Sequence, residues 1–345
     1  MFSEKWTDEK LAELEERIAK EYEQAYKELK KKGDAYFKKF KKRYEKEYQA
    51  YLDGHYTKQQ FDMWVYAQLG RGRRWELLRD TMAERVTKAN EVAAKYINDL
   101  TPTIFSLNAN FEAFIAEGSH AGVSFALISE ETVKRLMTKD RKLLPKRKID
   151  VPKDKKWNQK KLQSALLQGI LQGDTTEQIA KRFKRVTDMN QSSAIRNART
   201  AVTGAMNAGT HYTMNEAYLM GIEDDKYWLA TKDLKTRTSH QRLDGEHVPL
   251  SEKFSNGLRY PGDPDGKPEE VYNCRCTLTS RDRIQVTKRK SRVGNPEYLA
   301  LGETDDERRK KQREIEKETG RYIPNTVVVN EMNYKEWLEW KSKSS

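Results

Sequence analysis

The sequence contains no long hydrophobic run. None of its segments approaches the ~18 consecutive apolar residues of a membrane-spanning helix, so we expect no membrane span. The first ten residues, MFSEKWTDEK, are polar and lack the apolar segment of a signal peptide. We therefore expect a protein of the cytosol, or one that is assembled from it.

Cysteine is scarce as well, because Cys274 and Cys276 are the only two in 345 residues. Two cysteines exclude a disulfide framework. A bridge between positions i and i+2 is geometrically poor, so we do not expect these two thiols to be oxidised together. The motifs G-x-x-x-x-G-K-[ST] and G-x-S-x-G are also absent, which leaves P-loop nucleotide hydrolysis and α/β-hydrolase chemistry without support.

The chain is rich in charged residues and poor in apolar ones. Hydrophobic residues make up 36% of the chain and charged residues 34%, and 66 Lys and Arg against 53 Asp and Glu give a net charge of +13. Mean hydropathy is −0.98. At about 150 residues per domain, this length indicates about two domains, with much of the surface solvated or completed by a partner.

A positive charge of this size attracts polyanions such as nucleic acid, an anionic membrane face or an acidic protein. Residues 140–161 hold ten Lys and Arg against three Asp, and residues 281–292 hold six against one. The candidate basic patches are centred on Lys146, Arg147, Lys148, Lys288, Arg289 and Lys290. They are interpreted either as a solvated linker and tail or as non-specific contacts to double-stranded DNA, since no RNA-recognition, zinc-finger or helix-turn-helix signature is present.

The N-terminal third has helical periodicity. Its apolar and aromatic residues fall on one stripe, made of Leu11, Leu14, Ile18, Tyr22, Tyr26, Leu29, Phe37, Phe40, Tyr44, Tyr48 and Tyr51. Gly33-Asp34 interrupts this stripe, so the segment is predicted to be a helical hairpin or one bent long helix. The Tyr-rich stripe fits either docking to a partner or an ordinary intramolecular helix pair.

Further helices are predicted by periodicity and by end signals. The expected helices cover residues 57–69, 74–99, 129–137, 157–172, 175–186 and 190–220. Thr57 with Gln60, and Thr175 with Gln178, have the spacing of capping boxes. We expect Pro102 to end the helix before it and residues 103–128 to be helix or strand. Small residues at Gly204, Ala205, Ala208 and Gly209 would let helices pack closely.

The pattern changes near residue 226. A strand, a turn and a short helix are predicted, then loops over 251–270 and a closing strand at 272–280. Two further helices are expected after 286. The fold class is therefore mainly α with a small α+β C-terminal domain, including a turn-rich β region near 226–280. We predict four parts: 1–139 (helical, docking to portal or capsid), 140–156 (basic linker), 157–285 (α+β domain) and 286–345 (charged tail with a terminal helix).

Residues 228–276 contain the candidate site. Thiolates and imidazoles are the usual ligands of zinc. A structural zinc site would draw its ligands from His240, His247, Cys274 and Cys276, and Asp244 could replace His247. Alternatively, His240 caps a turn and the cysteines pack as small apolar groups, or one cysteine is a nucleophile oriented by His240. The spacing excludes a zinc deaminase, which requires H-x-E and P-C-x-x-C.

The order of motifs from residue 198 to residue 276 is distinctive. The strings are ART (198–200), W-x4-D (228–233), RTSH (237–240), LDG (243–245), PGDP (261–264) and NCRC (273–276). Together they resemble the phage head morphogenesis domain of the Mu F-like minor head proteins, over roughly residues 160–280. Arg237, Asp244 and Gly245 belong to this motif set. One departure is Ala201, where Glu often follows the ART string in the family.

The resemblance implies a virion structural protein, present in few copies near the portal vertex. We expect a phage minor head protein that acts in head morphogenesis and is not an enzyme. Its expected partners are the portal protein, capsid and scaffold proteins, and double-stranded DNA, in a virion assembled in the host cytoplasm. The alternative is a metal-dependent or thiol enzyme acting on nucleic acid or peptide through His240, Asp244, Cys274 and Cys276.

Overall fold

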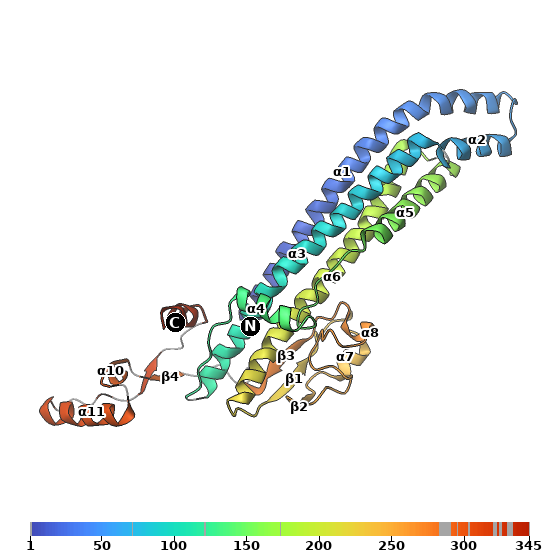
Figure 1. Cartoon of the computed structure of the whole chain (residues 1–345). Coiled ribbons are helices and arrows are strands. Elements are labelled where there is room, and N and C mark those ends of the chain that lie inside the picture. The colour runs from blue at the N-terminus through green and yellow to red at the C-terminus, as the bar shows by residue number, and fades with distance from the viewer. Residues whose placement is uncertain are drawn as a thin grey trace.

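Four long helices form an extended bundle (Figure 1). The computed structural model describes residues 2–70, 72–120, 122–172, 174–282, 291–294, 296–302, 304–319, 323, 326–329 and 334–344. The bundle helices are α1 (Phe2–Leu52), α3 (Arg73–Ser119), α5 (Val151–Leu171) and α6 (Thr176–Leu219). The short helix α2 (Lys58–Gly70) follows α1 at one end of the bundle, which we call the distal end.

A small antiparallel sheet lies beside α6 at the opposite, proximal end. Its strands have the order β2-β1-β3, and their bounds are β1 (Asp225–Leu229), β2 (His247–Pro249) and β3 (Thr277–Ser280). Two short helices, α7 (Thr238–Arg242) and α8 (Pro268–Val271), interrupt the loops of the sheet. The predicted fold class, mainly α with a small β part, is confirmed.

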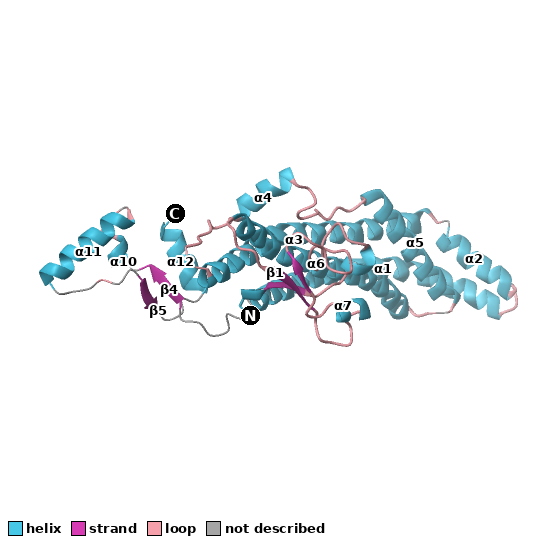
Figure 2. Ribbon diagram, turned by 90° about the horizontal axis from the view of Figure 1, so that it is seen from below, coloured by secondary structure: helices cyan, strands magenta, loops and turns pink. Residues whose placement is uncertain are grey.

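The C-terminal elements lie beyond the proximal end of the bundle, on the side away from α2 (Figure 2). They are β4 (Ser291–Gly294), α10 (Pro296–Leu299), α11 (Asp305–Thr319), β5 (Thr326–Val329) and α12 (Tyr334–Ser344). The last helix packs on its own chain, because Trp337 is buried and its Nε1 donates to Glu117 Oε2 of α3 at 2.9 Å. Both helices predicted after residue 286 are present.

Helix α1 is a single long helix and not a hairpin, which agrees with the second of the two predicted alternatives. The glycine that interrupts the stripe faces the bundle: a Cβ on Gly33 would lie in ordinary van der Waals contact with the Phe183 ring, at 3.7 Å. The inward face of the first half is buried at Leu14, Ile18, Tyr22 and Leu29. The stripe therefore packs mainly within the chain.

Helix α3 does not end at Pro102, contrary to the prediction, and continues to Ser119. A proline in a helix interior removes the hydrogen bond to the carbonyl four residues earlier. Here that carbonyl belongs to Asn98, and the Thr101 hydroxyl donates to it at 3.4 Å. Burial of the following turns, including Phe105, supplies the packing that keeps the helix intact.

The predicted linker is shorter than expected, because α5 begins at Val151 and not at residue 157. Asp150 caps this helix by accepting from the Lys153 N–H at 3.2 Å. The segment before it is held to α3, since Asn98 Nδ2 donates to the Arg147 carbonyl at 2.9 Å and Asn98 Oδ1 accepts from the Arg147 N–H at 2.8 Å. Residues 146–148 are therefore an exposed strip on the bundle and not a free arm.

Polar side chains buried inside the bundle join three of its helices. Asn90 Nδ2 of α3 donates to Asp154 Oδ2 of α5 at 2.7 Å and to Asn190 Oδ1 of α6 at 2.8 Å. Asn190 Nδ2 in turn donates to Asn158 Oδ1 at 3.0 Å. A buried amide pairs in only one alignment of neighbouring helices, so this layer fixes their register.

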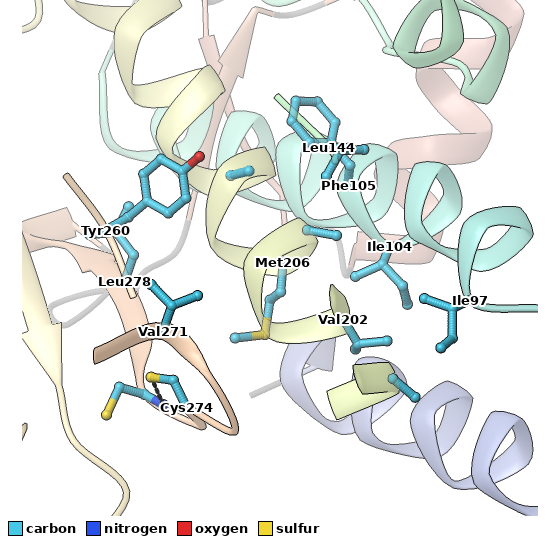
Figure 3. Close-up of a cluster of buried hydrophobic side chains, with 14 of the residues drawn as sticks. Ile97, Ile104, Phe105, Leu144, Val202, Met206, Tyr260, Val271, Cys274 and Leu278 are labelled. Atoms are coloured by element: carbon cyan, nitrogen blue, oxygen red, sulfur yellow. Dashed lines mark hydrogen bonds between the residues drawn. The ribbon is translucent and has the colours of Figure 1, made fainter. Parts of the chain in front are cut away.

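One hydrophobic core contains residues of both the predicted helical part (1–139) and the predicted α+β part (157–285). Figure 3 shows Met206 and Val202 of α6 between Ile104 of α3 on one side and Leu278 and Val271 of the sheet region on the other. The glycine and alanine positions on α6 allow this packing, as predicted. A Cβ on Gly209 would lie 2.3 Å from the Phe105 carbonyl oxygen.

Candidate metal centre

The candidate site lies where α7 faces the loop between α8 and β3. His240 projects from α7, and the edge-on ring of Trp228 in β1 lies 5.1 Å from its imidazole. Cys274 and Cys276 follow Asn273, which adopts the left-handed conformation with φ of 57°. The Asn273 N–H donates to Thr200 Oγ1 of α6 at 2.8 Å, so the turn is fixed to the bundle.

Three side chains converge in this space. His240 Nδ1 lies 3.6 Å from Cys274 Sγ and 3.4 Å from Cys276 Sγ. All three ligand atoms are within 4.8 Å of one another. The side chains are 1–3% exposed, so the cluster is enclosed by protein. Three of the four residues predicted as zinc ligands are therefore brought together.

The other imidazole nitrogen is paired. His240 Nε2 lies 2.8 Å from Glu270 Oε2 on α8, so the ring donates this proton to the carboxylate and leaves Nδ1 unprotonated toward the sulfurs. Backbone N–H groups point at both sulfurs: Cys276 N donates to Cys274 Sγ at 3.4 Å, and the Thr231 N–H bonds to Cys276 Sγ. These donors stabilise thiolates.

The two thiols differ in acidity. The hydrogen bond from Cys274 lowers the pKa of Cys276. The same hydrogen bond and burial raise the pKa of Cys274 well above its ordinary value.

His247 is not part of the cluster, which corrects the prediction of a four-residue ligand set. It lies in β2, its side chain is exposed, and its Nδ1 is 3.6 Å from Asp225 Oδ2. Its proposed substitute, Asp244, is engaged elsewhere, since Asp244 Oδ1 accepts from the Ala230 N–H at 3.0 Å. The residue that the sequence reasoning missed is Glu270, whose role depends on a contact across 30 residues.

Comparison with known proteins places this site within a recognised domain. The family described as "Phage Mu protein F like protein" matches residues 160–279, which include α6, the sheet and the His-Cys cluster. "Minor head protein GP7" of Bacillus phage SPP1 is 24% identical over 281 residues, covering 80% of this chain and 84% of that protein. This chain is therefore similar to phage minor head proteins, both in the matched domain and over most of its length.

A second relative is an enzyme. "NAD(+)--arginine ADP-ribosyltransferase EFV" of Enterococcus faecalis is 34% identical over 114 residues, which are 32% of this chain. The match spans only 23% of that enzyme's own length. No solved structure is significantly similar. In the part of this chain that the structure describes, no helix combines the length and the apolar character of a membrane span.

The remaining motif residues shape the turns around the cluster. The Arg237 guanidinium donates to the carbonyls of Glu269 and Tyr272, which holds the segment carrying Glu270. Gly245 has a φ of 83°, a conformation that favours glycine, in the turn between α7 and β2. None of these residues is a metal ligand in this arrangement. Of the predicted basic residues, 146–148 lie on the bundle, and Lys288, Arg289 and Lys290 lie outside the described residues.

Asn207 of α6 is a second residue that the sequence reasoning missed. It is fully buried, and its Nδ2 donates to the carbonyls of Pro261 at 2.9 Å and Cys276 at 3.0 Å. Its Oδ1 accepts from the Leu278 N–H at 2.8 Å. One side chain thus joins the bundle to both the loop and the strand that flank the cluster.

Proposed function

We propose that this protein is a structural component of the virion, located inside the head near the portal vertex. There it binds portal or capsid proteins and contacts packaged double-stranded DNA without sequence specificity. The family match over residues 160–279 and the similarity of four-fifths of the chain to a minor head protein support the first part. The observation that carries the DNA contact is the charge distribution along α1.

The two halves of α1 carry opposite net charges. Residues 2–29 contain nine acidic and five basic residues, whereas residues 30–52 contain nine basic and three acidic residues. The basic half lies toward the distal end of the bundle (Figure 1). The two basic runs identified in the sequence, residues 140–161 and 281–292, lie outside α1 and do not reveal this concentration of basic residues.

The basic residues of the distal half share one face. Phe37, Phe40 and Tyr44 mark the inward side of the helix, and the opposite side forms what we call the basic face. The basic face consists of Lys31, Lys32, Lys38, Lys39, Lys42, Arg43 and Lys46. All seven are exposed, and in the part of the chain that the structure describes none of them forms an ion pair.

The spacing of these cations fits the charge density of DNA. At a rise of 1.5 Å per residue, the basic face spans roughly 22 Å. Double-stranded DNA carries one negative charge per about 1.7 Å of axis, so a straight row of cations neutralises several phosphates and releases their counterions. Lysine contacts to phosphate do not read the sequence.

Neutralising the basic face should weaken DNA binding. The variant Lys31→Gln/Lys38→Gln/Lys39→Gln/Lys42→Gln keeps good helix formers and removes four positive charges. We expect its affinity for a random-sequence duplex to fall about tenfold or more. The plot of log K against log salt should become shallower by about 3 to 4, or about 0.9 per lost phosphate contact. Fluorescence anisotropy at several salt concentrations measures both quantities.

The matched control removes the same charge from the other half of the bundle. It is Lys10→Gln/Lys20→Gln/Lys27→Gln/Lys88→Gln, the half-buried Lys10 and three exposed lysines, all of which pair with neighbouring glutamates. Its DNA affinity should stay within about threefold of wild type, because the lost charges were already balanced locally. Equal losses in both variants would show a net-charge effect and contradict a specific basic face.

Docking to head proteins is proposed for the distal end. Large apolar side chains are exposed there on α2 and the end of α1, at Leu52, Met63 and Tyr66. Such side chains mark protein interaction sites when they gather on one surface. We expect Met63→Ser/Tyr66→Ser to reduce co-purification with procapsids severalfold, and Leu234→Ser, which removes a fully exposed side chain near the sheet, to leave it unchanged. Undiminished recovery of the double variant would exclude this surface.

The same proposal treats the His-Cys cluster as structural and the protein as a non-enzyme. The side chains of His240, Cys274 and Cys276 are almost fully buried, which denies a macromolecular substrate access to them. Asp244, which the enzyme alternative required, lies outside the cluster. The ADP-ribosyltransferase similarity covers less than a quarter of that enzyme and therefore supplies no activity for this chain.

A further inference from the structure

The convergence of one imidazole and two cysteines points to a bound metal. We propose that His240 Nδ1 and the thiolates of Cys274 and Cys276 hold one zinc ion, and that Glu270 fixes the imidazole from behind. This inference concerns the stability of the sheet region and is independent of the proposed role in the head.

The distances between the ligand atoms fit zinc. With Zn–S of about 2.3 Å, Zn–N of about 2.0–2.1 Å and tetrahedral angles, the sulfur-to-nitrogen separation in such a site is about 3.5 Å. The two separations here are 3.4 and 3.6 Å. Both sulfur-to-nitrogen separations therefore match a tetrahedral site, and the two sulfurs lie within 4.8 Å of each other.

Hydrogen bonding alone explains the arrangement less well. His240 Nδ1 has one lone pair and accepts one S–H proton, yet two sulfurs lie at nearly the same distance from it. A cation between the three atoms satisfies both sulfurs and the nitrogen together. Two thiolates also balance the charge of a divalent ion, which removes the cost of burying it unpaired.

The surrounding groups have the organisation of an outer ligand shell. A ligating histidine generally donates its other N–H to a carboxylate or carbonyl, which sets its tautomer. Glu270 fills this role at 2.8 Å. The backbone N–H donors at both sulfurs act on the thiolate form. Two soft sulfur ligands and one imidazole favour zinc over magnesium or calcium, which prefer oxygen.

The ion would tie together segments that have little regular structure of their own. His240 belongs to the five-residue helix α7, and the cysteines belong to a loop that leads into the four-residue strand β3. Short elements of this kind gain stability from a metal because binding occurs only in the folded state. Zinc would thus hold α7 against the C-x-C loop.

Metal content and spectroscopy of the full chain test this proposal. Purified protein should contain about one zinc per chain by elemental analysis, or bind one equivalent of added Zn²⁺ after chelation. Substitution with Co²⁺ should give thiolate-to-metal charge-transfer bands and tetrahedral d–d bands, a readout that needs no variant. Protein that takes up neither ion, or a Co²⁺ spectrum without thiolate bands, would overturn the proposal.

Variants assign the ligands. Cys276→Ser should lower zinc occupancy at least tenfold, whereas His247→Ala, the histidine outside the cluster, should keep one zinc per chain. Glu270→Gln should bind zinc about 10–100-fold more weakly while keeping thiolate bands in the Co²⁺ form, as expected of a positioning residue. Loss of zinc from His247→Ala, or full occupancy in Cys276→Ser, would contradict the assignment.

Discussion

Replacing Asn207 with alanine is expected to lower the free energy of unfolding by about 3–5 kcal/mol. The side chain is fully buried and makes three hydrogen bonds to backbone groups of Pro261, Cys276 and Leu278. Alanine leaves two carbonyls and one N–H without their partner in a dry interior. Each such group costs about 1–3 kcal/mol, and some relaxation reduces the total.

Urea unfolding followed by tryptophan fluorescence and far-UV circular dichroism measures this change. Of the seven tryptophans, Trp228 reports most directly on the sheet region, because it lies in β1 beside the strand that Asn207 holds. Asn215→Ala is the matched control, because its amide donates only to His211 on the same helix. A loss for Asn207→Ala no larger than that of the control would mean that water or local rearrangement replaces its bonds.

The sequence predicted the helix starts that depend on contacts between residues close together in the chain. Gln60 and Gln178 lie three residues after a threonine, and both side chains accept from the threonine N–H, at 2.8 and 2.6 Å. Ser129 likewise accepts from the Thr132 N–H at 3.2 Å at the start of α4 (Glu130–Lys139). These bonds depend on spacing along the chain, which a sequence displays directly.

The predictions that failed did so because of contacts between residues far apart in the sequence. A proline at position 102 is a strong local stop signal, but the burial of Phe105 and its neighbours outweighs it. His247 and Glu270 differ in role because strand β2 exposes the first and helix α8 directs the second toward His240. No spacing rule separates these two residues before the loops are folded.

The basic face was missed for a related reason. Linear runs of lysine drew attention to residues 140–161 and 281–292, while the row from Lys31 to Lys46 is interrupted by aromatic residues. It becomes one face only because α1 remains helical through Gly33, a position where a hairpin was an equal alternative. The continuity of α1 through Gly33 thus aligns the seven cations.

Gly209→Ala should lower the free energy of unfolding by about 3 kcal/mol, at the upper end of the usual range for overpacked sites. An added Cβ would lie 2.3 Å from the Phe105 carbonyl oxygen and 3.1 Å from the Ala109 nitrogen. Both atoms belong to the backbone of α3, so no flexible side chain can move aside. The helices must separate, which also strains the bond from Thr213 Oγ1 to the Ala109 carbonyl at 2.8 Å.

Thermal unfolding checks this prediction against Gly118→Ala, which adds the same methyl group to an exposed position of α3 with nothing within 4 Å. There, alanine should raise stability by about 0.5–1 kcal/mol through helix propensity. Opposite signs for the two variants would show that contact between α3 and α6, and not glycine content, limits stability. The same separation would weaken the sheet region, because Asn207 lies on α6 two residues before Gly209 and holds β3 to the bundle. A Gly209→Ala protein as stable as wild type would mean that the two helices can shift apart at little cost.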